Sequence, residues 1–148
     1  MSRPEQDTMT LQAGQPLAEE GLAWLAGIAE RDGWPAALRF QLSLCLEEAL
    51  ANVQRHAFAG PAASQAPQLQ LRCRRAGRAI ALEIADNGPA FDPTAASLAP
   101  LAATLDEAQP GGHGLRLMRH YLSDMQYRRE AGLNRLTLVS LESLPDAD

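Results

Sequence analysis

The stretch from Leu42 to Phe58, LSLCLEEALANVQRHAF, constrains the fold of this chain more than any other segment. At the helical period of about 100° per residue, its apolar residues gather on one side. These residues are Leu42, Leu46, Ala49, Leu50 and Val53. The pattern therefore predicts a long amphipathic helix with one face in the core.

A polar strip runs beside that apolar stripe. Glu48, Asn52 and His56 recur every four residues, and Arg55 falls among them. A carboxylate such as Glu48 can accept a proton or orient a nucleophile. The amide oxygen of Asn52 can hold a hard cation such as Mg²⁺. An ordinary solvated helix face would show the same spacing, so the rest of the chain has to decide between the two interpretations.

Length and composition indicate one soluble globular domain over residues 1–148, with a core from about 8 to 141 and short flexible termini. The chain is 46% hydrophobic and 21% charged. It has no apolar run long enough to span a bilayer, and its N-terminus, MSRPEQDTMT, has no signal-peptide core, so we expect no membrane partner and a cytoplasmic location. The two cysteines, Cys45 and Cys73, are expected to be reduced structural thiols.

Charge excludes several classes of partner and scaffold. A formal net charge of −5 argues against nucleic acid bound through its phosphates. The basic cluster from Arg72 to Arg78 is expected on an exposed hairpin. All 13 basic residues are arginine. The absence of lysine excludes a Walker A loop and the eukaryotic protein kinase scaffold, since both need a lysine on the phosphates.

The other elements follow from periodicity and turn residues. Helices are predicted for Pro16–Arg31 and from Pro35 to about Phe58, packed antiparallel because the turn between them is short. Strands are predicted at 8–13, 68–75, 79–85, 127–131 and 133–141, and a short helix at 115–122. The last strand has apolar residues in both phases, which predicts that both of its faces are covered. The expected fold is an α/β (α+β) two-layer sandwich, with a mixed, mostly antiparallel sheet covered on one face by helices.

A second candidate site lies in IADNGPAFDP, at the end of a predicted strand. Asp86 can accept a hydrogen bond from an exocyclic amine such as that of adenine. Gly88 would let a flat ring approach the backbone, and Phe91 can form a wall of the pocket. An ordinary Asp-Asn-Gly turn is the alternative.

A third candidate site follows the long segment from Pro93 to Pro110, which is expected to be a lid or disordered. The chain then continues as GGHGLRLM. Gly111, Gly112 and Gly114 free the backbone just before a predicted helix. Backbone N–H groups at such a helix start bind phosphates.

In this order, the three segments resemble the boxes of the GHKL ATPase superfamily, which has the Bergerat ATP-binding fold. The N box is matched by Glu48, Asn52 and His56; the first glycine box, DxGxxFD, by Asp86, Gly88, Phe91 and Asp92; the second, GGxGL, by Gly111, Gly112, Gly114 and Leu115. Within the superfamily the chain most resembles the anti-sigma-factor serine/threonine kinases of bacteria. EEALANVQRHAF is similar to their N box, and Ser123–Tyr127 with Gly132–Asn134 is similar to their closing hairpin. The resemblance covers about Leu17 to Leu141.

The resemblance implies ATP and Mg²⁺ as cofactors and assigns roles to these residues. Asn52 would coordinate the Mg²⁺ that bridges the phosphates, and Glu48 would be the base or the orienting group for the attacking hydroxyl. Asp86 would bind the adenine amine and Gly88 would make room for the base. Gly112 and Gly114 would hold phosphates through their amides. The implied partners are an anti-sigma-factor antagonist, a small protein with an acceptor Ser or Thr, and a sigma factor sequestered by the kinase. A homodimer is also implied.

Two alternatives remain open at this stage. The protein can be a nucleotide-gated protein-binding module without kinase turnover, or a detached histidine-kinase catalytic domain. Two residues also depart from the family pattern. His113 can touch a phosphate or be an exposed loop residue, and Arg55 can neutralise phosphate charge or form a surface ion pair.

Overall fold

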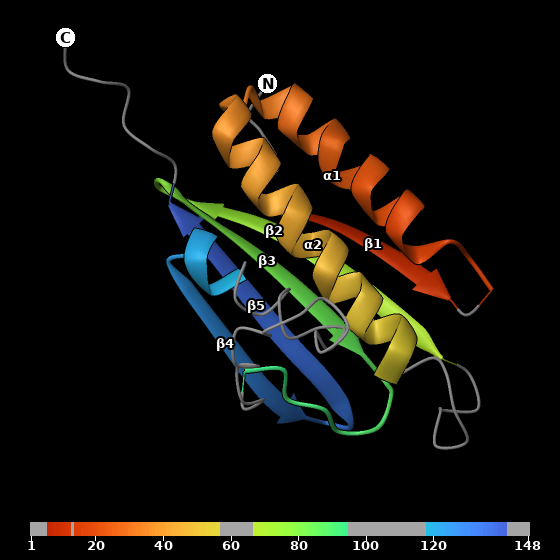
Figure 1. Cartoon of the computed structure of the whole chain (residues 1–148). Coiled ribbons are helices and arrows are strands. Elements are labelled where there is room, and N and C mark those ends of the chain that lie inside the picture. Colours follow the sequence, from red (N-terminus) through yellow and green to blue (C-terminus); the bar gives the residue numbers. More distant parts are fainter. Residues whose placement is uncertain (1–5, 13, 57–66, 95–117, 142–148) are drawn as a thin grey trace, which may run out of the picture.

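The computed structural model describes residues 6–12, 14–56, 67–94 and 118–141. A five-stranded sheet forms one layer and two long helices form the other (Figure 1). The strands are β1 (Gln6–Gln12), β2 (Gln68–Ala76), β3 (Ala79–Asp86), β4 (Asp124–Glu130) and β5 (Leu133–Leu141), in the sheet order β1-β2-β3-β5-β4. All pairings between these strands are antiparallel. The predicted two-layer α/β sandwich with helices on one face is confirmed, but the sheet of the described strands is wholly antiparallel rather than mixed.

The two helices lie side by side on one face of the sheet and run in opposite directions (Figure 1). Helix α1 (Leu17–Asp32) ends at Gly33, whose φ of 67° is left-handed and suits glycine. Helix α2 (Ala36–His56) begins directly after Pro35, whose fixed φ is compatible with a first helical turn. Both helices match their predicted ranges closely over the described residues, because turn residues and apolar period agree. Residues 57 and 58, the predicted end of the second helix, lie outside the described part.

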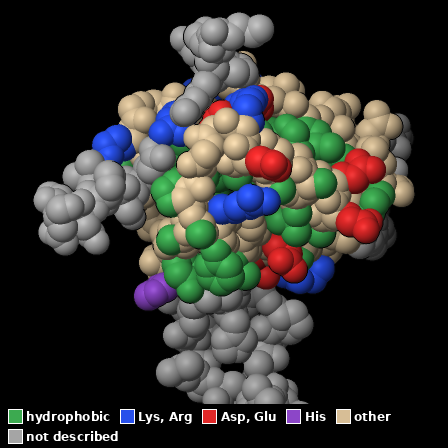
Figure 2. Space-filling view, turned by 90° about the horizontal axis from the view of Figure 1, so that it is seen from above, with side chains coloured by type: hydrophobic (Ala, Val, Ile, Leu, Met, Phe, Trp, Pro, Cys, Tyr) green, Lys and Arg blue, Asp and Glu red, His purple; other side chains and the backbone are tan. Residues whose placement is uncertain are grey.

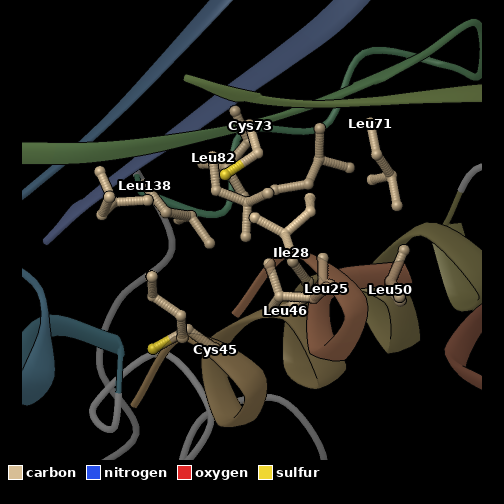
Figure 3. Packing of buried hydrophobic residues seen from close by; sticks show 14 of the residues in the cluster. Leu25, Ile28, Cys45, Leu46, Leu50, Leu71, Cys73, Leu82 and Leu138 are labelled. Atoms are coloured by element: carbon tan, nitrogen blue, oxygen red, sulfur yellow. The ribbon is translucent and has the colours of Figure 1, made fainter. Parts of the chain in front are cut away.

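The core fills the space between the helices and the sheet (Figure 3). Leucine, isoleucine and cysteine side chains from both layers point toward one another there. They include Leu25 and Ile28 of α1, Cys45, Leu46 and Leu50 of α2, Leu71 and Cys73 of β2, Leu82 of β3 and Leu138 of β5. Burial of this apolar surface is the main force that holds the layers together.

Strand β5 differs from its prediction at one point. Asn134, Leu136, Leu138 and Ser140 are buried on the helix side. The opposite phase is half-buried, and Leu141 at its end is 59% exposed. The expectation that both faces of this strand are covered is wrong here, because both long helices pack on the same face of the sheet.

Strand β4 and the short helix before it differ from their predicted bounds, whereas β5 has the predicted bounds. Strand β4 begins at Asp124 rather than Tyr127, and its turn to β5 uses Ala131 and Gly132, both with positive φ. Residues 118–121 of the helix predicted at 115–122 are helical, and Met118 is fully buried. Residues 115–117 lie outside the described part.

The surface and the helices bear on possible partners. No helix in the described ranges is long and apolar enough to cross a bilayer. On the face shown in Figure 2, acidic and arginine side chains are interspersed rather than gathered by sign.

Candidate active site

A cleft lies between the C-terminal turns of α2 and strands β3, β4 and β5. Figure 1 shows the end of β3 and the turn between β4 and β5 beneath that end of the helix. The cleft draws residues from two of the three predicted segments. Its walls are Ala49, Asn52, Val53, His56, Ile84, Asp86, Phe91, Pro93, Tyr127, Asn134 and Leu136. The helix face and the Asp86 turn, more than thirty positions apart in the sequence, therefore meet at one place.

The helix side of the site carries Glu48 and Asn52 one turn apart. The guanidinium of Arg55 reaches both: its Nη2 lies 2.6 Å from Asn52 Oδ1 and 3.5 Å from Glu48 Oε1. Burial raises the pKa of the Glu48 carboxyl, and the positive charge of Arg55 offsets part of that rise. A raised pKa makes Glu48 a stronger base than an exposed glutamate.

The sheet side of the site carries Asp86, which is 6% exposed. Its Oδ1 accepts hydrogen bonds from the Gly88 N–H and from Asn134 Nδ2, each at 2.9 Å. Burial raises the pKa of Asp86, while these two hydrogen bonds and the charge of Arg129 oppose the rise. Among the described residues both bonds end on Oδ1, so Oδ2 is the oxygen that can accept from a purine amine.

Asn134 was not predicted as a site residue, although its segment was matched to the closing hairpin of the family. Its Nδ2 also donates to the Pro89 carbonyl at 2.8 Å. Its Oδ1 accepts from the Tyr127 hydroxyl at 2.6 Å, from Arg129 Nη1 at 3.1 Å and from the Phe91 N–H at 3.2 Å. The sequence did contain a signal for Asn134: it is a polar residue on the same face of the strand as Leu136 and Leu138. A side-chain amide buried on that face is costly unless it is hydrogen-bonded.

Arg129 ties the turn after β3 to strand β4. Its Nη1 donates to the Gly88 carbonyl at 2.7 Å as well as to Asn134. The register explains this contact, because Asp86 pairs with Asn134 across the β3–β5 ladder and Asn134 pairs with Arg129 across β5–β4. The Asp86 turn is thus held from two neighbouring strands.

Aromatic residues form one wall of the cleft. The Phe91 ring stacks on the His56 imidazole, with centroids 3.9 Å apart and planes inclined by 15°. Burial and the nearby Arg55 charge lower the pKa of His56, which favours the neutral, stacked ring at neutral pH.

Asp92 has a local role: its Oδ1 accepts from the Thr94 N–H and hydroxyl at 2.8 and 2.6 Å.

Oxygen donors for a divalent metal are present on the helix side. Asn52 Oδ1 and the Glu48 carboxylate face the same place and are half-buried. The described ranges contain no group of three or more His, Cys, Asp or Glu residues that could hold a metal. A Mg²⁺ here would take one or two protein oxygens and complete its shell with phosphates and water, which is how this ion binds in nucleotide sites.

The predicted phosphate residues are Gly111, Gly112, His113, Gly114 and Leu115, and all of them lie outside the described residues. Their roles stay predictions. Of the other predicted site residues, Asn52, Asp86 and Phe91 line the cleft, and the Gly88 N–H donates to Asp86. Glu48 does not line it, but its carboxylate pairs with Arg55, which also donates to Asn52.

Comparison with known proteins agrees with this geometry. The model of the histidine kinase-like ATPase domain family matches residues 15–140. A protein named serine/threonine-protein kinase BtrW, from Bordetella bronchiseptica strain RB50, is 51% identical over 141 residues, which cover 95% of this chain and 96% of the relative.

Two solved structures with the same fold are histidine kinases. One is the histidine kinase domain of the blue-light activated kinase EL346 from Erythrobacter litoralis, with a TM-score of 0.53 and 17% identity; the match covers 96% of this chain and 66% of that one. Another is the histidine kinase AdeS from Acinetobacter baumannii, with a TM-score of 0.50, 12% identity and coverage of 93% and 68%. At these identities the likeness shows the fold alone. The family model and the arrangement of the cleft together show that this chain belongs to the histidine kinase-like ATPase domain family.

Proposed function

We propose that this protein is an ATP- and Mg²⁺-dependent serine/threonine protein kinase that acts as an anti-sigma factor. It phosphorylates a small anti-sigma-factor antagonist and sequesters a sigma factor. The observation that carries the proposal is the convergence of Asn52 and the Asp86 turn at one cleft, with Glu48 linked to Asn52 through Arg55. The name of the relative from Bordetella bronchiseptica, a serine/threonine-protein kinase, supports the reaction class.

The chemistry follows from the two walls of the cleft. Asp86 accepts the adenine amine on Oδ2, and Phe91 packs beside the base. Asn52 would hold a divalent metal through Oδ1, and that metal would supply positive charge to neutralise the phosphates during phosphoryl transfer. Glu48, with its raised pKa, takes the proton of the acceptor hydroxyl.

The partners are proteins in this proposal. The antagonist presents a Ser or Thr hydroxyl to Glu48, and the sigma factor binds the kinase when the antagonist is absent. Because a sigma factor acts in the cytoplasm, the kinase acts there too. We also expect it to be a homodimer, as the resemblance to the anti-sigma-factor kinases implies. Size-exclusion chromatography with light scattering measures the subunit number.

Transfer of labelled phosphate from ATP to a candidate antagonist tests the function. Glu48→Gln should lower the transfer rate by about 10²-fold or more, the usual contribution of a general base, while ATP affinity changes little. Glu47→Gln is the matched control, because Glu47 is exposed on the same helix and carries the same charge.

The outcomes separate the competing functions. Loss of transfer in Glu48→Gln with normal transfer in Glu47→Gln supports the kinase. If the parent protein binds ATP tightly and transfers no label to any antagonist, it is a nucleotide-gated binding module. If Glu48→Gln transfers at the parent rate, the role assigned to Glu48 is wrong.

A further inference from the structure

Arg55 occupies the position next to Asn52 that the proposed metal needs. Its Nη2 donates to Asn52 Oδ1 at 2.6 Å, a short charge-assisted hydrogen bond, and lies 3.5 Å from Glu48 Oε1. These two contacts place a positive charge on the same two oxygen donors. The helix favours a cation here, since Arg55 lies in the last turn of α2, where the macrodipole is negative.

A metal ion and the Arg55 guanidinium cannot both bind Asn52 Oδ1 without strong repulsion. Mg²⁺ binds oxygen at about 2.0–2.1 Å, so an ion on Oδ1 and the Arg55 nitrogen would lie only about 4 Å apart. Like charges at that separation repel strongly in a partly buried site. Mg²⁺ also demands near-ideal geometry around its ligands, which a guanidinium on the same oxygen would obstruct. One cation therefore has to leave when the other arrives.

Arg55 is able to leave. Its side chain is 38% exposed, so it can turn into solvent without opening the core. Its departure would also release Glu48 from the ion pair, because the Arg55 Nη2 atom lies 3.5 Å from Glu48 Oε1. Metal loading and the freeing of the base would then occur together.

We propose that Arg55 is an internal cation that competes with Mg²⁺ for Asn52, so that ATP loading exchanges one cation for the other and Arg55 sets the magnesium requirement. This inference rests on the proposed function. While Arg55 is bonded to Asn52, that molecule cannot bind the metal. The apparent metal affinity is therefore the intrinsic affinity multiplied by the fraction of molecules in which Arg55 has left Asn52.

The test is a titration of Mg²⁺ at fixed non-hydrolysable ATP analogue, with nucleotide binding followed by calorimetry. Arg55→Gln should lower the magnesium midpoint by about three- to tenfold, the range expected for one partly exposed charge-assisted hydrogen bond. The Mg²⁺ concentration at the midpoint is the informative quantity. Nucleotide affinity is not, because removing a positive charge near the phosphates changes it whether or not metal is bound.

Arg39→Gln is the matched control. It removes the same charge from an exposed position of α2, about 24 Å before Arg55 along the helix axis at 1.5 Å per residue. Its magnesium midpoint should equal that of the parent protein. Arg55→Lys keeps the charge but lacks the planar fork, and its midpoint should lie between those of the parent and Arg55→Gln.

A structure of the parent protein with Mg²⁺ and the ATP analogue provides a second readout. The Arg55 Nη2 to Asn52 Oδ1 distance should exceed 3.5 Å once the metal is on Asn52. This measurement decides the question even if Arg55→Gln fails to fold. A metal on Asn52 with the Arg55 bond still intact overturns the inference.

The remaining outcomes also separate the two proposals. If the parent protein shows no magnesium-dependent ATP binding, the proposed function and this inference are both wrong. If the parent binds Mg-ATP and Arg55→Gln keeps its midpoint or raises it, Arg55 is not a competitor, and the proposed kinase function stands.

Discussion

At the scale of single residues, the site depends on a buried carboxylate, Asp86, whose two hydrogen bonds from described residues both go to one oxygen. Asp86 is 6% exposed, and its Oδ1 is bonded to Gly88 and Asn134 while its pKa is raised by burial. A folded-state pKa above the ordinary value means that the folded protein binds this proton more tightly than the unfolded chain. The contribution of Asp86 to stability is therefore lost as the pH rises from the ordinary value of 3.8 through the raised pKa.

Asp86→Asn should separate stability from binding. The asparagine Oδ1 can keep both hydrogen bonds, so the change removes a buried charge and should stabilise the fold by on the order of 1 kcal/mol at pH 7. Its amide then points a donor at the adenine amine, and ATP affinity should fall by about tenfold or more. Urea unfolding at pH 7 and pH 4 and calorimetric ATP binding measure the two effects. The stability gain should shrink at the lower pH, and unchanged ATP binding would remove Asp86 from the site.

At the scale of elements, α2 can present the site because α1 packs closely against it. A Cβ at Gly21 of α1 would lie 2.6 Å from the Leu50 Cδ1 atom of α2, whereas nothing lies within 4 Å of a Cβ at Gly27 of the same helix. Leu50 is 1% exposed, so its side chain has little free space to move into. Alanine substitution at Gly27 therefore measures helix propensity alone, whereas alanine at Gly21 measures propensity together with crowding against α2.

Gly27→Ala and Gly21→Ala should therefore differ in sign or size. Gly27→Ala should stabilise the protein by about 0.5–1 kcal/mol, the gain of alanine over glycine in an exposed helix position. Gly21→Ala gains the same propensity but should lose about 1–3 kcal/mol to overpacking against Leu50. Chemical denaturation of both variants measures the difference, and equal stabilities would show that the helices are not in close contact at Gly21.

At the scale of the whole molecule, the core seals both thiols. Cys45 and Cys73 are 0% and 4% exposed, and burial raises their pKa values to about 11 and about 12. Since the unfolded chain ionises first, stability should fall as the pH rises above the ordinary value of 9.0. At pH 8 a thiol reagent such as DTNB should modify the native protein at least about 10²-fold more slowly than the unfolded chain. Rapid labelling of either cysteine without denaturant would contradict this packing.

The same scale explains what the sequence could and could not predict. Helices α1 and α2 and the hairpin of β2 and β3 follow from local patterns, because caps, turns and apolar period lie within each segment. Asp86 was predicted from its own turn. Asn134 and Arg129 were not, because their roles depend on β5 pairing with β3, a contact between segments about fifty residues apart. The roles of Gly111–Leu115 stay predictions.

The sheet order has a consequence for biosynthesis. Strand β3 lies between β2, its predecessor in the chain, and β5, which is made last among the described strands. A nascent chain that has left the ribosome only as far as the Asp86 turn lacks the side chains of Asn134 and Arg129 that fix it. The Asp86 side of the cleft therefore assembles late, only after the C-terminal hairpin of β4 and β5 has docked on β3.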